Sequence, residues 1–318
     1  MKYRIFGKTG SHVSEIGFGC WAIGGNSYGT VKDEESLEAL QLAYERGVNF
    51  FDTADIYGQG HSEEILSKFL KKKPRDRIFI ASKVGFDFYH GAVKKNFDAN
   101  YIRFACESSL KRLKVEAIDI YQLHNPSVDV LGEGNALETL QKLQREGKIR
   151  FMGVSVHSEE EALRSLEDER VQSLQVIYNL IDQRMAHRVF GEAYAKGVGI
   201  IAREPLACGM LTGKYPADHE FPKNDHRRGW RREQIALEIK KVERLKTIIA
   251  TDRLTLPRAA LEFVLDNDYV STVIPGMKRK EQVYENLSAT EKPELRPQES
   301  SILRNLFTED PVFSEGLR

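Results

Sequence analysis

The chain has few of the features that mark secreted, metal-bound or membrane proteins. Its 318 residues include only three cysteines, Cys20, Cys106 and Cys208. An odd number of widely spaced cysteines does not indicate a disulfide framework or a zinc knuckle. No apolar run approaches the ~20 residues that cross a bilayer, and the first residues lack the apolar core of a signal peptide. We therefore expect a cytoplasmic protein without a bound metal and without a membrane segment.

An excess of charge of either sign is also absent. Lys and Arg together number 47, and so do Asp and Glu, which gives a formal net charge of zero. Without a net field, neither nucleic acid nor an anionic membrane is an expected partner. The composition is 41% hydrophobic and 30% charged, which is typical of a globular protein with a sizeable core.

Helix-like and strand-like segments alternate along almost the whole chain. The helix predicted over Asp33–Arg46 carries apolar residues at helical spacing, with Asp33 as its N-cap. It stops at Gly47, and two later helices stop in the same way at Gly147 and Gly197. Glycine after a helix end adopts the left-handed C′ conformation without steric cost. A strand-like apolar run follows each of these glycines.

Eight such runs are present, and they are apolar almost throughout, which indicates parallel strands covered on both faces. Eight strands alternating with helices predict a (β/α)8 TIM barrel with its active site at the C-terminal rim. We expect one domain over residues 1–318, with an N-terminal β-hairpin (Tyr3–Phe6 and His12–Ser14) closing the bottom. The predicted strands are Glu15–Gly19, Val48–Asp52, Ile78–Val84, Ala117–His124, Ile149–Val156, Leu174–Tyr178, Val198–Ala202 and Val270–Pro275.

Three connections are longer than the others, and all follow the C-terminal ends of strands. They are residues 85–100 after strand three, 125–134 after strand four and 215–230 after strand seven. Long loops at the active rim of a barrel usually carry binding function.

Four polar residues stand at or just past predicted strand ends: Asp52, Tyr57, Lys83 and His124. If their strands are parallel neighbours, the four side chains converge on one rim. A phenol, an ammonium, a carboxylate and an imidazole could there transfer a proton to a carbonyl oxygen. This reaction class is the first functional hypothesis.

Together these motifs resemble the aldo-keto reductase family. The resemblance covers nearly the whole chain, and it depends on the order and spacing of many short pieces. These pieces are Phe51-Asp52-Thr53-Ala54-x-x-Tyr57-Gly58, Lys83, Leu123-His124, Gly153-Val154-Ser155, Gln175-x-x-Tyr178-Asn179, Pro205-Leu206-x-x-Gly209-x-Leu211-Thr212-Gly213-Lys214, Ile274-Pro275-Gly276 and Glu285-Asn286.

The resemblance implies an oxidoreductase that uses NADPH or NADH to reduce aldehydes and ketones. Tyr57 would then be the general acid, and Lys83 would lower the pKa of its phenol from the usual ~10. Asp52 would hold the Lys83 ammonium, and His124 would orient the substrate carbonyl. We lean to NADP(H), with NAD(H) as the other candidate, because Lys278 and other basic residues precede a helix N-terminus that suits the 2′-phosphate.

The resemblance also implies which residues bind the cofactor. Ser155 and Gln175 would bind the carboxamide, and the loops after strands seven and eight would bind the phosphates. The cofactor residues implied in this way are Gly19, Cys20, Trp21, Asp52, Ser155, Gln175, Arg203, Pro205, Leu206, Gly209, Leu211, Gly213, Lys214, Gly276, Lys278, Arg279, Gln282, Glu285 and Asn286.

Two positions depart from the family pattern. Val156 stands where many members have asparagine, and Arg203 stands where an aromatic residue often stacks on the nicotinamide. A guanidinium is planar and can stack, but it carries a positive charge. We therefore hypothesise that Arg203 favours binding of the reduced, uncharged nicotinamide over the oxidised cation.

The substrate is expected to be a small-molecule carbonyl or sugar. Aromatic side chains would line its pocket together with the catalytic residues. The chain after Asn286 is short, so we expect an open pocket and broad carbonyl specificity. The predicted pocket residues are Trp21, Tyr57, Phe86, Phe88, His124 and Trp230.

Three other functions stay open at this stage. The same four residues would serve an NAD(P)-dependent sugar or polyol dehydrogenase working in the oxidative direction. A cofactor-sensing regulatory subunit with little turnover is a second alternative. A phosphate-binding barrel that forms a Schiff base on Lys83 is a third.

Overall fold

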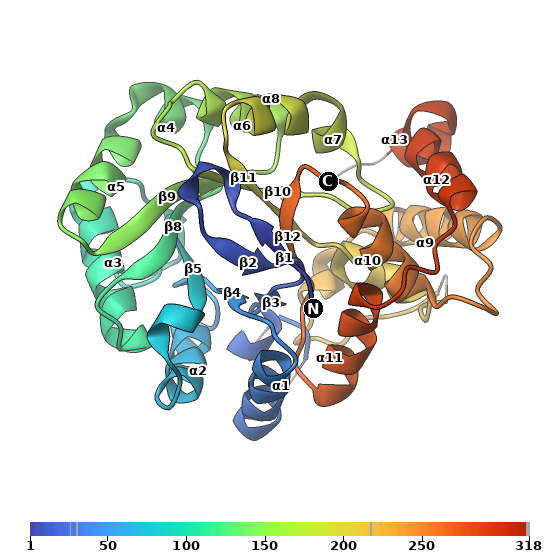
Figure 1. Ribbon diagram of the computed structural model, residues 1–318, viewed down its shortest axis with the longest axis horizontal. Coiled ribbons are helices and arrows are strands. Elements are labelled where there is room, and N and C mark those ends of the chain that lie inside the picture. The colour runs from blue at the N-terminus through green and yellow to red at the C-terminus, as the bar shows by residue number, and fades with distance from the viewer. Residues whose placement is uncertain (26, 30, 217, 316–318) are drawn as a thin grey trace.

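The computed structural model describes residues 1–25, 27–29, 31–216 and 218–315. Eight parallel strands form a barrel inside a ring of helices (Figure 1), which confirms the predicted fold. Neighbouring strands follow the order β12-β11-β10-β9-β8-β5-β4-β3. Their bounds are β3 Phe18–Gly19, β4 Phe50–Asp52, β5 Phe79–Val84, β8 Ile118–His124, β9 Ile149–Ser155, β10 Ser173–Ile177, β11 Gly199–Arg203 and β12 Val270–Ile274.

The barrel closes where its first strand meets its last. The Gly17 amide donates to the Val273 carbonyl at 2.8 Å, and the Gly19 amide donates to the Pro275 carbonyl at 3.0 Å. A Cβ atom on Gly19 would lie 2.8 Å from the Ile274 carbonyl oxygen, so only glycine permits this approach. Strand β3 is shorter than the predicted strand Glu15–Gly19, because the pairing before Phe18 is a single isolated bridge of Ile16 to Val273.

Helices cover the outside of the barrel (Figure 1). On α5, the apolar residues Leu137, Leu140 and Leu143 are buried as their spacing predicts. Helix α1 begins at Asp33 with Lys32 as its N-cap, so the prediction that Asp33 caps the helix is wrong. Its carboxylate instead contacts His61 and Lys68 of α2, both at 3.0 Å. The ring helices are α1 Asp33–Glu45, α2 His61–Leu70, α3 Ala99–Leu113, α5 Asn135–Arg145, α6 Glu159–Leu166, α7 Arg184–Arg188, α8 Phe190–Ala195, α10 Leu256–Leu265 and α11 Lys280–Leu287.

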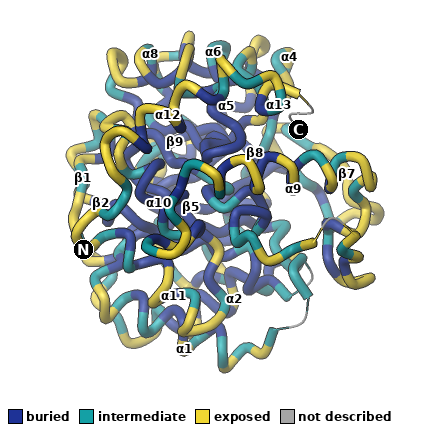
Figure 2. Tube along the Cα trace, turned by 90° about the vertical axis from the view of Figure 1, so that its right-hand side faces the viewer, coloured by how far each residue is buried: buried dark blue, intermediate teal, exposed yellow. Residues whose placement is uncertain are grey.

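Buried residues fill the interior of the molecule (Figure 2), and the apolar ones form two clusters. The larger lies between the strands and the helices. The smaller fills the lower barrel interior, where Phe79 lies with its ring centroid 5.6 Å from Phe50, 6.0 Å from Phe6 and 6.1 Å from Phe151. Strands β1 (Tyr3–Ile5) and β2 (His12–Ser14) form the predicted hairpin. Phe6 directly follows β1 in the connection between them, so the hairpin brings an aromatic ring to the bottom of the barrel.

The long connections at the C-terminal ends of the strands contain short elements of their own. The connection after β5 is a hairpin of β6 (Phe86–Asp87) and β7 (Lys94–Lys95), and the one after β8 contains α4 (Val128–Glu133). The connection after β11 contains the 3-10 helices η4 (Ala207–Thr212) and η5 (His226–Gly229) and leads into α9 (Arg232–Lys246). The remaining elements are η1 Gly7–Thr9, η2 Ala22–Gly24, η3 Arg75–Arg77, η6 Ser288–Thr290, α12 Pro297–Glu309 and α13 Pro311–Ser314.

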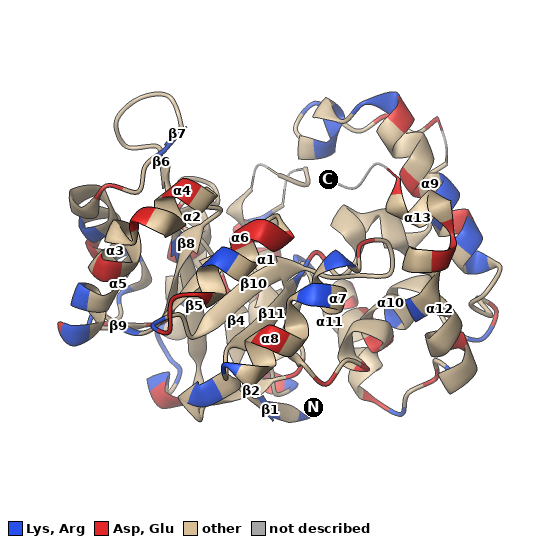
Figure 3. Ribbon diagram, turned by 90° about the horizontal axis from the view of Figure 1, so that it is seen from above, with Lys and Arg blue, Asp and Glu red and all other residues tan. Residues whose placement is uncertain are grey.

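Charged residues of both signs are interspersed over the outer helices (Figure 3). Among the described residues, none of the helices combines the length and the apolar character that a membrane crossing requires.

Candidate active site

A cavity of about 630 Å³ opens at the C-terminal ends of the strands. Its wall includes Asp52, Tyr57 and His124, and also Lys278 and Gln282 before and within α11. Barrel enzymes carry their active sites at this end. The cavity is therefore the candidate active site, and it is large enough for a drug-sized ligand.

A buried lysine connects two of the four predicted catalytic residues. The Nζ atom of Lys83 donates to Asp52 Oδ1 at 2.6 Å, to the Thr53 carbonyl at 2.9 Å and to the Tyr57 hydroxyl at 3.2 Å. Adjacent pairing of β4 and β5 brings these strand ends together. The side chains of Lys83 and Asp52 are 0% and 3% exposed, so water hardly screens the ion pair.

The charge state of Lys83 follows from these contacts. Burial alone would lower its pKa, but attraction to Asp52 and Tyr57 and the hydrogen bonds to both outweigh burial. The pKa of Lys83 is therefore raised above its usual value. A Schiff-base lysine must lose its proton to attack a carbonyl, so this environment disfavours Lys83 as a nucleophile.

Tyr57 departs from the expectation that its pKa is lowered. Burial raises the pKa of its phenol above the usual value, although Lys83 acts in the opposite direction. The sequence indicated that Lys83 lies near Tyr57, but it did not indicate how deeply the phenol is buried. Burial has the larger influence on the pKa of Tyr57. Tyr57 consequently carries its proton at neutral pH, as a general acid requires.

His124 faces Tyr57 from the end of β8. The two ring centroids are 6.0 Å apart at 81°, and the Phe86 ring is 4.9 Å from the imidazole. Burial, followed by the charges of Lys83 and Arg203, holds the pKa of His124 well below its usual value. The imidazole is therefore neutral, and a neutral ring donates from only one nitrogen. Within the described part of the chain, its Nδ1 has no hydrogen-bond partner.

Two further polar side chains line the cavity beside Asp52. Gln175 on β10 donates from Nε2 to Asp52 Oδ2 at 2.7 Å, and Ser155 ends β9. Both residues line the cavity wall, and the bond to Asp52 uses the amide nitrogen of Gln175 rather than its carbonyl oxygen. An amide ligand would find acceptor and donor groups there.

The opposite part of the wall contains glycine and basic residues. A Cβ atom on Gly276 would meet no atom within 4 Å, so this backbone leaves room for a ligand. Lys278 donates from Nζ to the Tyr28 carbonyl at 2.6 Å and from its amide to Gln282 Oε1 at 2.9 Å. Arg279 precedes α11 as its N-cap, and a helix N-terminus favours an anion.

Most of the predicted ligand-binding residues line the cavity, and some do not. Cys20 and Leu211 are fully buried in the apolar core, Phe88 stacks on Tyr89 with ring centroids 4.1 Å apart, and Arg279 pairs with Glu35. The predicted residues that line the wall are Gly19, Trp21, Asp52, Tyr57, Phe86, His124, Ser155, Gln175, Arg203, Pro205, Leu206, Gly209, Lys214, Gly276, Lys278 and Gln282. The predicted residues outside the wall are Cys20, Phe88, Leu211, Gly213, Trp230, Arg279, Glu285 and Asn286. Their roles stay predictions.

Two wall residues that the sequence did not indicate are Tyr28 and Arg227. Backbone pairing joins Tyr28 to Asp225, and the Arg227 guanidinium lies 5.1 Å from the Tyr28 ring centroid. The Tyr28 ring also meets Trp21 edge-on at 5.2 Å. Tyr28 forms an isolated β-bridge and Arg227 lies in η5, and neither segment has a periodic pattern in the sequence that would have indicated its place in the wall.

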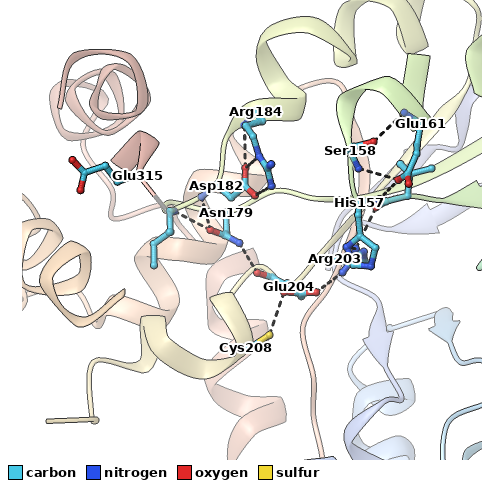
Figure 4. Close-up of polar contacts among 12 residues, drawn as sticks. His157, Ser158, Glu161, Asn179, Asp182, Arg184, Arg203, Glu204, Cys208 and Glu315 are labelled. Atoms are coloured by element: carbon cyan, nitrogen blue, oxygen red, sulfur yellow. Dashed lines mark hydrogen bonds and ion pairs between the residues drawn. The ribbon is translucent and has the colours of Figure 1, made fainter. Parts of the chain in front are cut away.

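Arg203 ends β11 in the wall, and its guanidinium is already engaged (Figure 4). It forms an ion pair with Glu204 and donates from Nη2 to the Val156 carbonyl at 3.2 Å and to His157 Nδ1 at 2.9 Å. The adjacent Glu204 carboxylate opposes the positive charge on which the hypothesis about the reduced nicotinamide depends. That hypothesis stays a prediction.

Comparison with known proteins identifies the family of the chain. The model of the Aldo/keto reductase family matches residues 15–307. The chain therefore belongs to the aldo/keto reductase family, whose members are oxidoreductases acting on carbonyl and alcohol groups with nicotinamide cofactors.

Three relatives illustrate the range of the family. The chain is 30% identical over 286 residues to the "Aldo-keto reductase yakc [NADP(+)]" of Schizosaccharomyces pombe, covering 87% of this chain and 84% of the relative. The structure of aldo-keto reductase AKR11C1 from Bacillus halodurans (holo form) is 30% identical, covers 96% of both chains and has a TM-score of 0.82. The glycerol dehydrogenase AKR11B4 from Gluconobacter oxydans is 28% identical, covers 96% of this chain and 94% of its own, and has a TM-score of 0.78.

Proposed function

We propose that the protein is an NADP(H)-dependent reductase of aldehydes and ketones, with Tyr57 as the general acid. The observation that carries this proposal is the buried Lys83 ammonium, which contacts both Asp52 and the Tyr57 hydroxyl at the cavity wall. The cofactor supplies the hydride when bound. The residues of the chain supply the proton, the orientation of the carbonyl and the cofactor site.

Each of the four residues has a distinct task. Tyr57 donates its hydroxyl proton to the carbonyl oxygen, which becomes an alcohol. Lys83 stabilises the phenolate left behind, and Asp52 keeps Lys83 in place through the 2.6 Å contact. The neutral imidazole of His124 donates a hydrogen bond that directs the carbonyl oxygen towards Tyr57. Acid catalysis of this kind contributes roughly 10² to 10⁴ in rate.

The polar groups of the cavity suit nicotinamide adenine dinucleotide phosphate. Ser155 and Gln175 offer the polar groups that a carboxamide requires, and the open backbone at Gly276 leaves room for phosphate groups. Lys214 and Lys278 line the same cavity and favour the additional charge of the 2′-phosphate. The relative from Schizosaccharomyces pombe is named for NADP(+), which agrees with this preference over NAD(H).

The substrate in this proposal is a small-molecule carbonyl compound of the cytoplasm. Trp21 and Phe86 provide aromatic surface in the wall near Tyr57, with the Trp21 and Tyr57 ring centroids 6.1 Å apart. No residue of α12 or α13 is among those that line the cavity. This supports the expectation of a broad range of carbonyl substrates.

A fluorescence titration of the purified protein with NADPH and NADH tests the proposal. We expect saturable quenching with tighter binding of NADPH, followed by oxidation of the bound nucleotide when a simple aromatic aldehyde is added. Failure of both nucleotides to bind would contradict the assigned cofactor site. Binding of NADH at least as tight as that of NADPH would contradict the assigned role of Lys214 and Lys278.

A second candidate is a sugar or polyol dehydrogenase working in the oxidative direction. The structural likeness to a glycerol dehydrogenase favours it, and the same proton transfer run backwards would serve it. Incubation with NADP(+) and glycerol or a sugar alcohol separates the two. Reduction of the nucleotide by a polyol, with no oxidation by any aldehyde tried, would favour the dehydrogenase.

A further inference from the structure

The ion pair at the end of β11 has a consequence for the cofactor. We propose that Arg203 and Glu204 together set the relative affinity of the cavity for the oxidised and reduced forms of the nicotinamide. Both would then be specificity-determining residues for redox state. The inference rests on the proposed function, because it concerns the same cofactor in the same cavity.

The guanidinium of Arg203 is fixed from several sides (Figure 4). It pairs with Glu204, and its Nη2 donates to Val156 and His157 at the end of β9. The side chains of Arg203 and Glu204 are only 13% and 19% exposed. A charge pair with so little access to water is weakly screened. The loss of either charge would therefore change the electrostatic potential within the cavity.

Glu204 is held independently of Arg203. Its backbone φ is +54°, in the left-handed region that residues other than glycine seldom adopt. Its carbonyl accepts a hydrogen bond from Asn179 Nδ2 at 2.9 Å, and its Oε2 accepts one from Cys208 Sγ at 3.2 Å. Such strained positions persist where the surroundings enforce them, often at functional sites. The carboxylate would therefore keep its place if Arg203 were changed.

The pair faces the part of the cavity where reaction would occur. Arg203 and Glu204 line the same cavity as Tyr57 and His124. The charge of Arg203 also acts on the pKa of both groups, after burial and Lys83 at His124 and after burial, Lys83 and Asp52 at Tyr57. A nicotinamide that delivers hydride beside Tyr57 must lie within reach of the same charge. The oxidised ring is a cation and the reduced ring is neutral, so the positive charge of Arg203 disfavours the oxidised form and the negative charge of Glu204 favours it.

In the intact pair the two influences oppose each other. The structure thus predicts opposite changes when either charge is removed. The substitution Glu204→Gln leaves Arg203 uncompensated and should raise the ratio of the Kd for NADP(+) to the Kd for NADPH by at least about fivefold. The substitution Arg203→Gln removes the positive charge while the Glu204 carboxylate stays, and it should lower the same ratio by at least about fivefold.

Two matched variants separate charge from packing. Arg203→Lys keeps the charge and loses the forked hydrogen bonds, so its ratio should stay near that of the unaltered protein even if both forms bind more weakly. Glu161→Gln removes a carboxylate from the neighbouring α6, where Glu161 caps the backbone amides of His157 and Ser158 at 2.9 and 3.0 Å. Glutamine can accept the same bonds, so this variant should leave the ratio unchanged.

The experiment is a fluorescence or calorimetric titration of each purified variant with NADPH and with NADP(+). Opposite shifts of the Kd ratio in Glu204→Gln and Arg203→Gln would support the inference. Equal ratios in all variants, or shifts in one direction, would overturn it while leaving the proposed function intact. Failure of the unaltered protein to bind either nucleotide would overturn both. If Arg203→Gln does not fold, the comparison of Glu204→Gln with Glu161→Gln decides.

Discussion

The lower and upper halves of the barrel interior use the same strands for opposite purposes. On β4, Phe50 points into the lower half and Asp52 into the upper half, and on β5 the same alternation separates Phe79 from Lys83. Successive inward positions of a strand lie two residues apart. A shift of two residues on β4, and of four on β5, therefore changes the interior from packed aromatic rings to a buried ion pair.

This contrast indicates a division between stability and chemistry. The lower half contains apolar side chains that gain from leaving water, whereas the upper half buries Lys83 and Asp52 at a desolvation cost that their contact must offset. In the proposed function, the upper half serves catalysis instead, because it holds the Tyr57 proton in place. The tests below would break or sharpen the distinction.

The largest effect is expected at the Tyr57 hydroxyl. Tyr57→Phe removes the transferable proton and should lower kcat by roughly 10² to 10⁴, while the Kd for NADPH changes little. Steady-state kinetics and nucleotide titration measure the two quantities. Tyr44→Phe makes the same chemical change on α1, where Tyr44 contacts Phe69 and Lys73, and should leave kcat unaltered. Near-normal turnover in Tyr57→Phe would remove Tyr57 from the mechanism.

Removal of the buried cation should cost stability as well as activity. Lys83→Met leaves the Asp52 carboxylate without its cation and should reduce the free energy of unfolding by about 3–5 kcal/mol. The double variant Asp52→Leu with Lys83→Met should recover much of that stability and remain inactive. Urea unfolding measures both. A double variant that is less stable than the single one would show that the ion pair itself stabilises the barrel.

A substitution in the lower half of the barrel should lower stability without lowering activity. Phe79→Ala leaves a cavity among three aromatic rings and should cost about 3–5 kcal/mol of unfolding free energy, with kcat of the folded protein nearly unchanged. Phe79→Leu should cost less, because it fills more of the space. Denaturant unfolding and kinetics on the same samples test the claim. A fall in kcat as large as that of Tyr57→Phe would show that the two halves are not separable.

The smallest effect is a pH dependence that originates at His124. The folded-state pKa of His124 lies well below the usual value, so folding favours the neutral ring. Its contribution to stability is fully present above the unfolded pKa of ~6.5. It is lost as the pH falls, with a slope of at most about 1.4 kcal/mol per pH unit.

Comparison with His124→Gln isolates this contribution. Unfolding free energies should fall less steeply with decreasing pH in the variant than in the unaltered protein. Other groups, such as His226, whose pKa is lowered first by burial, are present in both proteins and cancel in the difference. Parallel pH profiles would mean that His124 is not held neutral by the fold.

The sequence predicted those features of the fold and of the site that depend on residues close to each other in the chain. Glycines after helices and near-continuous apolar strands indicate the barrel, and the position of Lys83 at a strand end indicates its place at the rim. The Arg203–Glu204 pair was not predictable in this way, because it requires a left-handed backbone at a glutamate. The pKa of Tyr57 depends on burial, which the residue pattern does not reveal.

The sequence also could not show which aromatic residues line the substrate pocket. Trp21 and Phe86 line the cavity, whereas Phe88 and Trp230 do not. Phe88 packs on Tyr89 in the loop after β5, and Trp230 packs near His226 with ring centroids 5.8 Å apart. An aromatic side chain in a rim loop can turn either way, so the choice depends on contacts between loops rather than on sequence spacing.

The most direct test of hydride transfer at this site is an isotope-transfer experiment. The purified protein is incubated with NADPH that carries deuterium at the reactive ring carbon, together with an aromatic aldehyde, and the product is analysed by mass spectrometry. The account predicts an alcohol with deuterium on the carbinol carbon, formed by the unaltered protein and nearly absent with Tyr57→Phe. Product without deuterium, or an aldehyde adduct trapped on Lys83 by borohydride, would contradict it.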